Sequence, residues 1–139
     1  MSTEKPQVIR VRHVMKTGID IVSGMLTVRE ALNSLKHPET RTIIIDKRHD
    51  DDEYGVVMFR DIAQKVLAPN LSPDRVNLYE VMSKPVISVD PGMDIRYCTK
   101  LFDRFGLSRA PVLENGTIIG LVSYSDIVIH GMLEANGKD

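Results

Sequence analysis

Apolar residues along this chain form short runs, and the spacing within each run predicts a strand or a helix. Runs that are rich in β-branched residues predict strands, and they fall at 19–22, 42–45, 55–58, 86–89, 110–113 and 118–122. Apolar residues that recur every three or four positions predict helices, and they fall at 28–35, 60–67, 95–102 and 125–133. Shorter helical turns are expected at 10–15 and 78–82. The chain is therefore predicted to mix α and β structure.

Polar residues between these runs predict where the elements begin and end. Thr27 and Glu30 have the spacing of a capping box, in which each side chain accepts the other residue's backbone N–H. Asp94 is a plausible N-cap for the next long helix. Pro38 is expected to end the first helix. The pair Asn115-Gly116 predicts a tight β-hairpin turn.

The same order of elements occurs twice. Val14-Met15 is followed by the segment GVVMFRDI, which ends at Ile62, and Val81-Met82 by GLVSYSDI, which ends at Ile127. The interval from each methionine to the aspartate of its segment is 46 residues in the first copy and 44 in the second. Repeats of this kind usually bury an apolar face against each other. We expect one repeat at 10–68, a linker with two prolines at 69–76, and a second repeat at 77–134.

This repeated order, with Gly-h-h-x-x-x-Asp-h opening the last helix (h is apolar), resembles the CBS domain. Two copies in tandem resemble a Bateman module of the stand-alone bacterial type, over roughly residues 10–134. The resemblance implies an α/β (α+β) fold, in which two pseudo-twofold-related β-α-β-β-α repeats pack through their sheets. It also implies a homodimer that binds adenosine-containing ligands in clefts between repeats and regulates a partner.

The resemblance places a nucleotide site on the second copy. Asp126 would accept the ribose hydroxyls, Ser123 would meet ribose or phosphate, and Arg109 would hold a phosphate by two parallel hydrogen bonds. The residues implied are Lys84, Pro85, Val86, Ile87, Arg109, Ala110, Pro111, Ser123, Tyr124, Ser125 and Asp126. Structural alternatives remain open: Asp126 as a helix-start residue, Arg109 and Lys84 as solvated cations, and Tyr124 as a packing residue.

The first copy departs from this pattern. Met58 replaces the Ser or Thr, Thr42 replaces the basic residue, and Ile44 replaces the proline, whereas Asp61 remains. Met58 is interpreted as core filler. We expect a weaker second site, whose residues would be Lys16, Ile19, Asp20, Ile21, Arg60 and Asp61.

Composition and charge narrow the class of protein. The 139 residues carry a formal net charge of −1, so nothing favours wrapping nucleic acid. Cys98 is the only cysteine and is expected to lie buried on its helix, which suits a reducing compartment. The first residues lack the apolar run of a signal peptide, and no stretch reaches the roughly 20 apolar residues of a membrane helix. We therefore expect a cytoplasmic protein.

Other kinds of site find little support. The four histidines lack metal-ligand spacing. The acidic run at 49–53 is interpreted as a solvated hairpin rather than a cation site. No Ser/His/Asp or Cys/His arrangement is readable, so we expect no enzymatic activity. The favoured ligand is AMP, ADP or ATP. S-adenosylmethionine or NAD(H) is the first alternative, and a dimerisation scaffold without ligand is the second.

Overall fold

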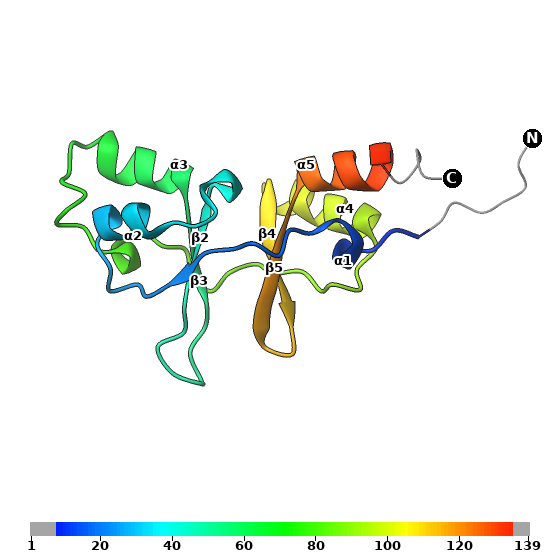
Figure 1. Ribbon diagram of the computed structural model, residues 1–139, viewed down its shortest axis with the longest axis horizontal. Helices are drawn as coiled ribbons and strands as arrows, with labels where there is room; N and C mark the ends of the chain where they lie inside the picture. Colours follow the sequence, from blue (N-terminus) through cyan, green and yellow to red (C-terminus); the bar gives the residue numbers. More distant parts are fainter. Residues whose placement is uncertain (1–7, 135–139) are drawn as a thin grey trace, which may run out of the picture. The chain divides into compact units, whose positions relative to one another are not determined.

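The computed structural model describes residues 8–134, which fold as two compact units (Figure 1). One unit consists of residues 18–86. The other joins the N-terminal segment up to Thr17 with the chain from Ile87 onward. Each unit has its own hydrophobic core and is described separately.

The unit 18–86 contains a three-stranded sheet. Strand β1 (Ile21–Val22) runs parallel to β2 (Thr42–Ile45), and β2 runs antiparallel to β3 (Gly55–Met58). Helices α2 (Val28–Ser34) and α3 (Phe59–Ile62) belong to the same unit. Its buried core is Val28, Ala31, Ile43, Ile45, Val57, Val66, Leu78 and Val81. All four residues of β2 are buried, as expected for a central strand.

The predicted capping box opens α2. Thr27 Oγ1 accepts the Glu30 N–H at 3.1 Å, and Glu30 Oε1 accepts the Thr27 N–H at 2.9 Å. The helix ends at Ser34, before the predicted stop at Pro38, which instead begins a 3-10 helix at Pro38–Thr40. The earlier end has a visible cause, because the Asp20 carboxylate accepts the two backbone N–H groups that follow Leu35, at 2.9 Å each.

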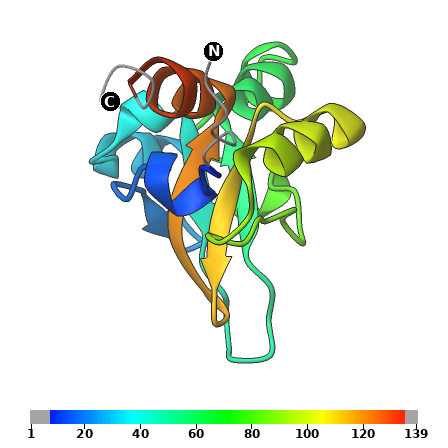
Figure 2. The ribbon, with the colours of Figure 1, turned by 90° about the vertical axis from the view of Figure 1, so that its right-hand side faces the viewer.

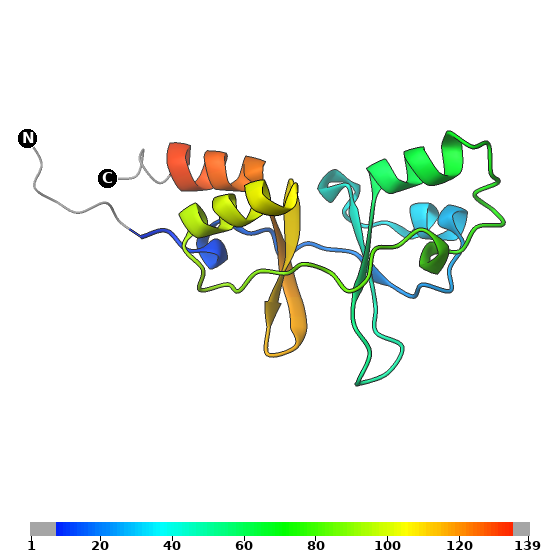
Figure 3. The ribbon, with the colours of Figure 1, turned by 180° about the vertical axis from the view of Figure 1, so that it is seen from behind.

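The second unit is built on a β-hairpin. Strands β4 (Arg109–Glu114) and β5 (Thr117–Ser123) pair antiparallel, and the predicted turn is confirmed, with φ of 53° at Asn115 and 78° at Gly116. Helices α1 (Val11–Val14), α4 (Ile95–Phe105) and α5 (Tyr124–Asp126) complete the unit. Figures 1 and 3 show α4 and the helix that begins at α5 beside one end of this hairpin, with its turn pointing away from them.

The predicted strand at 86–89 is wrong. Only Val89 pairs, through an isolated parallel bridge in which its N–H donates to Pro111 O at 3.0 Å and its carbonyl accepts the Leu113 N–H at 2.9 Å. Pro85 and Pro91 stand on either side of the segment and have no N–H to donate, which limits any longer ladder. The second repeat thus lacks the first strand expected of it.

The last helix of each repeat changes its hydrogen-bond pattern. Helix α3 continues as a π-helix at Ala63–Leu67, and α5 continues as a π-helix at Ile127–Glu134.

Cys98 and Asp94 of the second repeat are found as predicted. Cys98 is buried on α4, and the Asp94 carboxylate accepts the Arg96 N–H at 2.8 Å.

The Val-Met turn that opens each repeat packs with the core of the other repeat. Val14 lies in the core formed with α4, β4 and β5, although it opens the first copy. Val81, preceded by a 3-10 helix at Leu78–Glu80, lies in the core of the unit 18–86, although it opens the second copy. Figure 2 shows α1 (dark blue) next to the hairpin. The repeat boundaries at 10–68 and 77–134 stay a prediction, and the packing units divide the chain differently.

Candidate functional site

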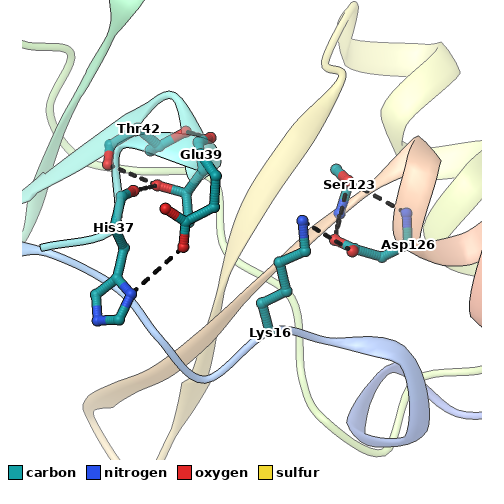
Figure 4. A network of polar contacts seen from close by, with 7 residues as sticks. Lys16, His37, Glu39, Thr42, Ser123 and Asp126 are labelled. Carbon is teal, nitrogen blue, oxygen red and sulfur yellow. Dashed lines mark hydrogen bonds and ion pairs between the residues drawn. The ribbon is translucent and has the colours of Figure 1, made fainter.

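The carboxylate of Asp126 is buried at the start of the last helix, where the residue is 3% exposed. Its Oδ2 accepts two hydrogen bonds from Ser123, one from the backbone N–H and one from Oγ, both at 2.9 Å. The Asp126 N–H donates in return to Ser123 Oγ at 3.3 Å (Figure 4). This reciprocal pair fixes the orientation of the carboxylate and caps the helix at once.

Lys16 supplies a cation to the same carboxylate. Its Nζ lies 3.6 Å from Asp126 Oδ1, and its side chain is 45% exposed (Figure 4). The sequence grouped Lys16 with Arg60 and Asp61 in a weaker site. The grouping with Arg60 and Asp61 stays a prediction, and within its own unit Lys16 lies beside Asp126, because the Val-Met turn preceding Lys16 packs with that unit.

Arg109 and Ser123 are directly paired across β4 and β5, which confirms that they lie on adjacent strands. Arg109 is half-buried, and its Nε lies 3.5 Å from Ser108 Oγ. Ala110 and Pro111 follow on β4 and are buried. The hairpin thus holds one guanidinium at the end of the ladder where α5 begins.

Two of the remaining predicted residues flank Asp126 on its own helix. Tyr124 packs its ring edge-on against Phe102, with centroids 5.2 Å apart and planes at 82°. This contact confirms a packing role for Tyr124, which is still 37% exposed. Ser125 is exposed.

The segment from Lys84 to Ile87 is divided between the two units. Lys84, Pro85 and Val86 belong to the unit 18–86, and Ile87 begins the other. Lys84 is not a freely solvated cation, because its Nζ lies 2.7 Å from Asp52 Oδ1.

Asp52 shows that the acidic run at 49–53 is not wholly solvated. Its side chain is 7% exposed, and Oδ2 accepts the Arg48 backbone N–H at 2.9 Å and Nε–H at 3.1 Å. The hydrogen bond from Lys84, followed by those from Arg48, lowers the pKa of Asp52 well below its ordinary value. The acidic run in the sequence did not indicate that the Asp52 side chain would be buried.

Asp61 occupies the position in the first repeat that Asp126 has in the second. Its Oδ2 accepts the Met58 N–H at 2.8 Å, and its Oδ1 lies 4.0 Å from Lys65 Nζ. The residue before the helix is half-buried Met58, which has no hydroxyl to donate. The two carboxylates therefore share the backbone contact and differ in their hydroxyl and lysine partners.

The other residues of the predicted weaker site lie in the unit 18–86 with Asp61. Both oxygens of the Asp20 carboxylate accept backbone N–H groups, which gives Asp20 a structural role. Ile19 is half-buried, whereas Ile21 and Arg60 are exposed. His37 Nδ1 lies 3.4 Å from Glu39 Oε1 in the same unit (Figure 4).

The described residues offer little support for a reactive thiol or a metal site. Burial raises the pKa of the Cys98 thiol to about 11, so the reactive thiolate is scarce near neutral pH. Within residues 8–134, no three His, Cys, Asp or Glu side chains gather where they could hold a metal ion. No helix in that part of the chain has the length and apolar character needed to cross a membrane.

Known proteins share this architecture. The family model of the CBS domain matches residues 78–132. A hexameric CBS-CP12 protein from bloom-forming cyanobacteria is 32% identical with a TM-score of 0.85, and the match covers 95% of this chain and 76% of that chain. The CBS domain pair of protein MJ0100, solved in complex with 5′-methylthioadenosine and S-adenosyl-L-methionine, is 20% identical with a TM-score of 0.76, covering 96% and 100%. At that identity the likeness shows the fold alone.

Curated relatives in archaea are longer than this chain. An uncharacterized protein of Methanopyrus kandleri is 31% identical over an alignment of 113 residues, and the match covers 78% of this chain. The matched part spans 57% of that relative and 64% of a second one, from Methanocaldococcus jannaschii. The similarity to the cyanobacterial structure extends over both repeats.

Proposed function

The chain belongs to the CBS domain family, and on this premise we propose that it is a regulatory module that binds an adenine nucleotide through Asp126. The observation that carries the proposal is a buried carboxylate with a hydroxyl and a cation beside it. Ser123 donates to Asp126 Oδ2 at 2.9 Å, and Lys16 lies 3.6 Å from Oδ1. A fixed acceptor of this kind suits a ligand with paired hydroxyl donors.

The chemistry of the carboxylate favours a ribose. An ionised carboxylate only accepts hydrogen bonds, and its two oxygens offer about four lone-pair sites. Ser123 uses Oδ2 twice, whereas Oδ1 faces the ammonium of Lys16, whose side chain is partly exposed. Ribose hydroxyls would donate to Asp126 in place of Lys16, which would then turn toward a phosphate.

Two cations favour a nucleotide over other adenosyl compounds. Lys16 and Arg109 both belong to the unit that contains Asp126, and Arg109 is paired with Ser123 across the hairpin. Phosphate groups gain from guanidinium and ammonium partners. S-adenosylmethionine has no phosphate and carries a sulfonium cation. The two compounds bound to the CBS pair of protein MJ0100 keep the adenosyl alternative open, and NAD(H) shares the phosphate chemistry.

The proposed output is a change of shape or assembly, with no bond made or broken. A ligand shifts such an equilibrium only by binding two states with different affinity. A homodimer is the proposed assembly, because several large apolar side chains on α4 and the last helix are exposed. They are Tyr97, Phe105, Val128, Ile129, Met132 and Leu133. A dimerisation scaffold without ligand is the rival function.

Isothermal titration calorimetry tests the proposal. Wild-type protein is titrated with AMP, ADP, ATP, adenosine, NAD and S-adenosylmethionine. Hydrogen bonds to a charged group contribute about 1.5–3 kcal/mol each, so Asp126→Asn should weaken the best ligand by at least about tenfold. The matched control is Asp61→Asn, which changes the corresponding carboxylate of the first repeat and should have the smaller effect.

Two results decide against the proposal. If no compound of the panel binds while the dimer is intact, the scaffold function is favoured. If a ligand binds equally well to wild type and to folded Asp126→Asn, the assignment of Asp126 is wrong. Arg109→Ala separates the ligand classes, because it should weaken AMP and leave adenosine unchanged.

A further inference from the structure

A cavity of about 840 Å³ lies within the unit 18–86, in the size range of small-molecule sites. Three segments line it: the loop after β1, the end of β2 with the start of the next loop, and the segment around Met82. The lining residues are Ser23, Gly24, Met25, Ile45, Asp46, Lys47, Arg48, Tyr79, Met82 and Lys84. Among the residues of the proposed nucleotide sites, only Lys84 is present here.

The cavity is at the opposite end of the sheet from Asp61. Asp61 follows the last residue of β3, Met58, which pairs with Thr42 at the start of β2. The cavity is lined by Ile45, the last residue of β2, which pairs with the first residue of β3. It is therefore a different site from the one predicted around Asp61, and all its walls lie outside the unit that contains Asp126.

Part of the cavity lining is apolar and exposed to solvent. Met25 is 69% exposed and Tyr79 is 49% exposed, and both line the cavity with Ile45 and Met82. A ligand that covered these side chains would remove apolar surface from water. The phenol ring of tyrosine offers a flat stacking surface, and methionine side chains adapt to irregular shapes. This part of the lining suits the aromatic ring system of a ligand.

Another part of the lining carries positive charge. Lys84 is only 22% exposed, and its ammonium is held 2.7 Å from Asp52 Oδ1, which uses one of its three donors. Lys47 and Arg48 add two more cations, of which Arg48 is bonded to Asp52 and the Lys47 ammonium lies 5.0 Å from the centre of the Tyr54 ring. The lining has one carboxylate, that of Asp46. Even with Asp52 counted, the cations outnumber the carboxylates by one. A ligand with a single acid group would complement the charge of these cations.

We propose that this cavity binds an aromatic anion with one acid group: an aromatic carboxylate, sulfonate or phosphate monoester. The aromatic body covers Met25 and Tyr79, and the acid group meets the cations near Lys84. The proposal does not rest on nucleotide binding at Asp126, because Lys84 is the one residue that the cavity shares with the predicted nucleotide sites.

A pair of fluorescent probes tests both halves of the proposal. 8-Anilino-1-naphthalenesulfonate carries one sulfonate, and N-phenyl-1-naphthylamine is its uncharged analogue. We expect both to bind, the sulfonate more tightly. Raising the sodium chloride concentration from about 50 mM to about 500 mM should lower the affinity for the sulfonate several-fold, since salt screens exposed charges. It should not lower the affinity for the uncharged probe.

Matched variants locate the probes. Met25→Asp brings a repelling carboxylate into the cavity, and Tyr79→Ala removes the flat ring; each should lower sulfonate affinity by about fivefold or more. The controls Met132→Asp and Tyr97→Ala change side chains of the other unit that are also more than half exposed, and they should leave the sulfonate affinity unchanged. Asp126→Asn should leave it unchanged as well. Circular dichroism melts check that each variant is folded, and Tyr79→Ala decides the test if Met25→Asp does not fold.

Three results overturn the proposal. Sulfonate binding that is lost in Met132→Asp and kept in Met25→Asp places the probe on the exposed helices. Equal affinity and equal salt dependence for the two probes refute the role of the cations. Absence of binding by both probes refutes the cavity as a ligand site.

Discussion

The ammonium of Lys16 lies 3.6 Å from the carboxylate of Asp126, although the two residues are near opposite ends of the chain. The backbone explains how they meet. Lys16 and Leu121 exchange two hydrogen bonds, each 2.8 Å long, which add Lys16 to the edge of β5. The segment that opens the first repeat thereby contributes a cation to the carboxylate of the second.

Lys16→Met should distinguish the contribution of the phosphate to ligand affinity from the contribution of the ribose. Loss of the ammonium should weaken AMP by roughly three- to tenfold, because a partly exposed ion pair contributes little more than about 1 kcal/mol. Adenosine should not bind more weakly, since Asp126 loses a competitor for Oδ1. Calorimetry with the two compounds makes the comparison, and Lys65→Met, at the lysine paired with Asp61, is the control. A parallel loss of both ligands would refute the proposed exchange.

The glycines that begin the repeated segments GVVMFRDI and GLVSYSDI, Gly55 and Gly120, should differ in how well they tolerate a side chain. A Cβ on Gly120 would lie 2.6 Å from the Lys16 carbonyl oxygen, a backbone atom held by β5. A Cβ on Gly55 would lie 2.7 Å from Met82 Sδ, the flexible end of a side chain. We expect Gly120→Ala to destabilise by about 1–3 kcal/mol and Gly55→Ala by less, as measured by urea unfolding. The opposite order would contradict the close contact at Lys16.

Much of the fold was predictable from local chemistry. The capping box at Thr27 and the turn at Asn115-Gly116 were both found as predicted, because each depends on a few adjacent residues. The strand predicted at 86–89 was wrong, because apolar spacing does not show that only Val89 finds a pairing partner there. The cross-packing of the Val-Met turns left no local signal at all.

The pairing of Asp52 with Lys84 and Arg48 predicts a specific acid sensitivity. The folded state lowers the pKa of Asp52, so its contribution to stability is complete above the unfolded value, about 3.9, and is lost as the pH falls below it. Asp52→Asn should therefore be less stable than wild type at pH 7. The difference should shrink as the pH falls below about 4.

Thermal unfolding between neutral pH and about pH 3 measures this change, over the window set by the unfolded aspartate pKa. Asp51→Asn is the matched control, because Asp51 is the exposed neighbour in the same acidic run. Its difference from wild type should not follow the same pH course. A stability difference for Asp52→Asn that is constant with pH would show that the carboxylate is not the source.

Thr27→Ala should destabilise the unit 18–86 by about 1 kcal/mol, the usual effect of removing an N-cap side chain. The cause is specific: the Glu30 N–H loses the Oγ1 acceptor that lies at 3.1 Å. Thr27→Ser keeps that acceptor and should restore most of the stability. Urea unfolding of the three proteins measures the effect, and equal loss in both variants would argue against the cap.

The individual residues of the candidate site could be picked out from the sequence. Which of them lie in the same packing unit could not. The sequence singled out Asp126, Ser123 and Arg109, and the structure holds them in one unit. It assigned Lys16 to the other repeat, since linear order was the only guide to grouping. It offered Lys84 as a nucleotide-site residue or a solvated cation and did not predict the ion pair, because its partner Asp52 lies 32 positions away within a run of charges.

A crystal structure of the protein grown with AMP would show whether Asp126 binds the ribose. We predict ribose hydroxyls within hydrogen-bond distance of the Asp126 carboxylate, with the phosphate facing Arg109 or Lys16. Density for AMP bound elsewhere, with Lys16 still on Asp126, would contradict it.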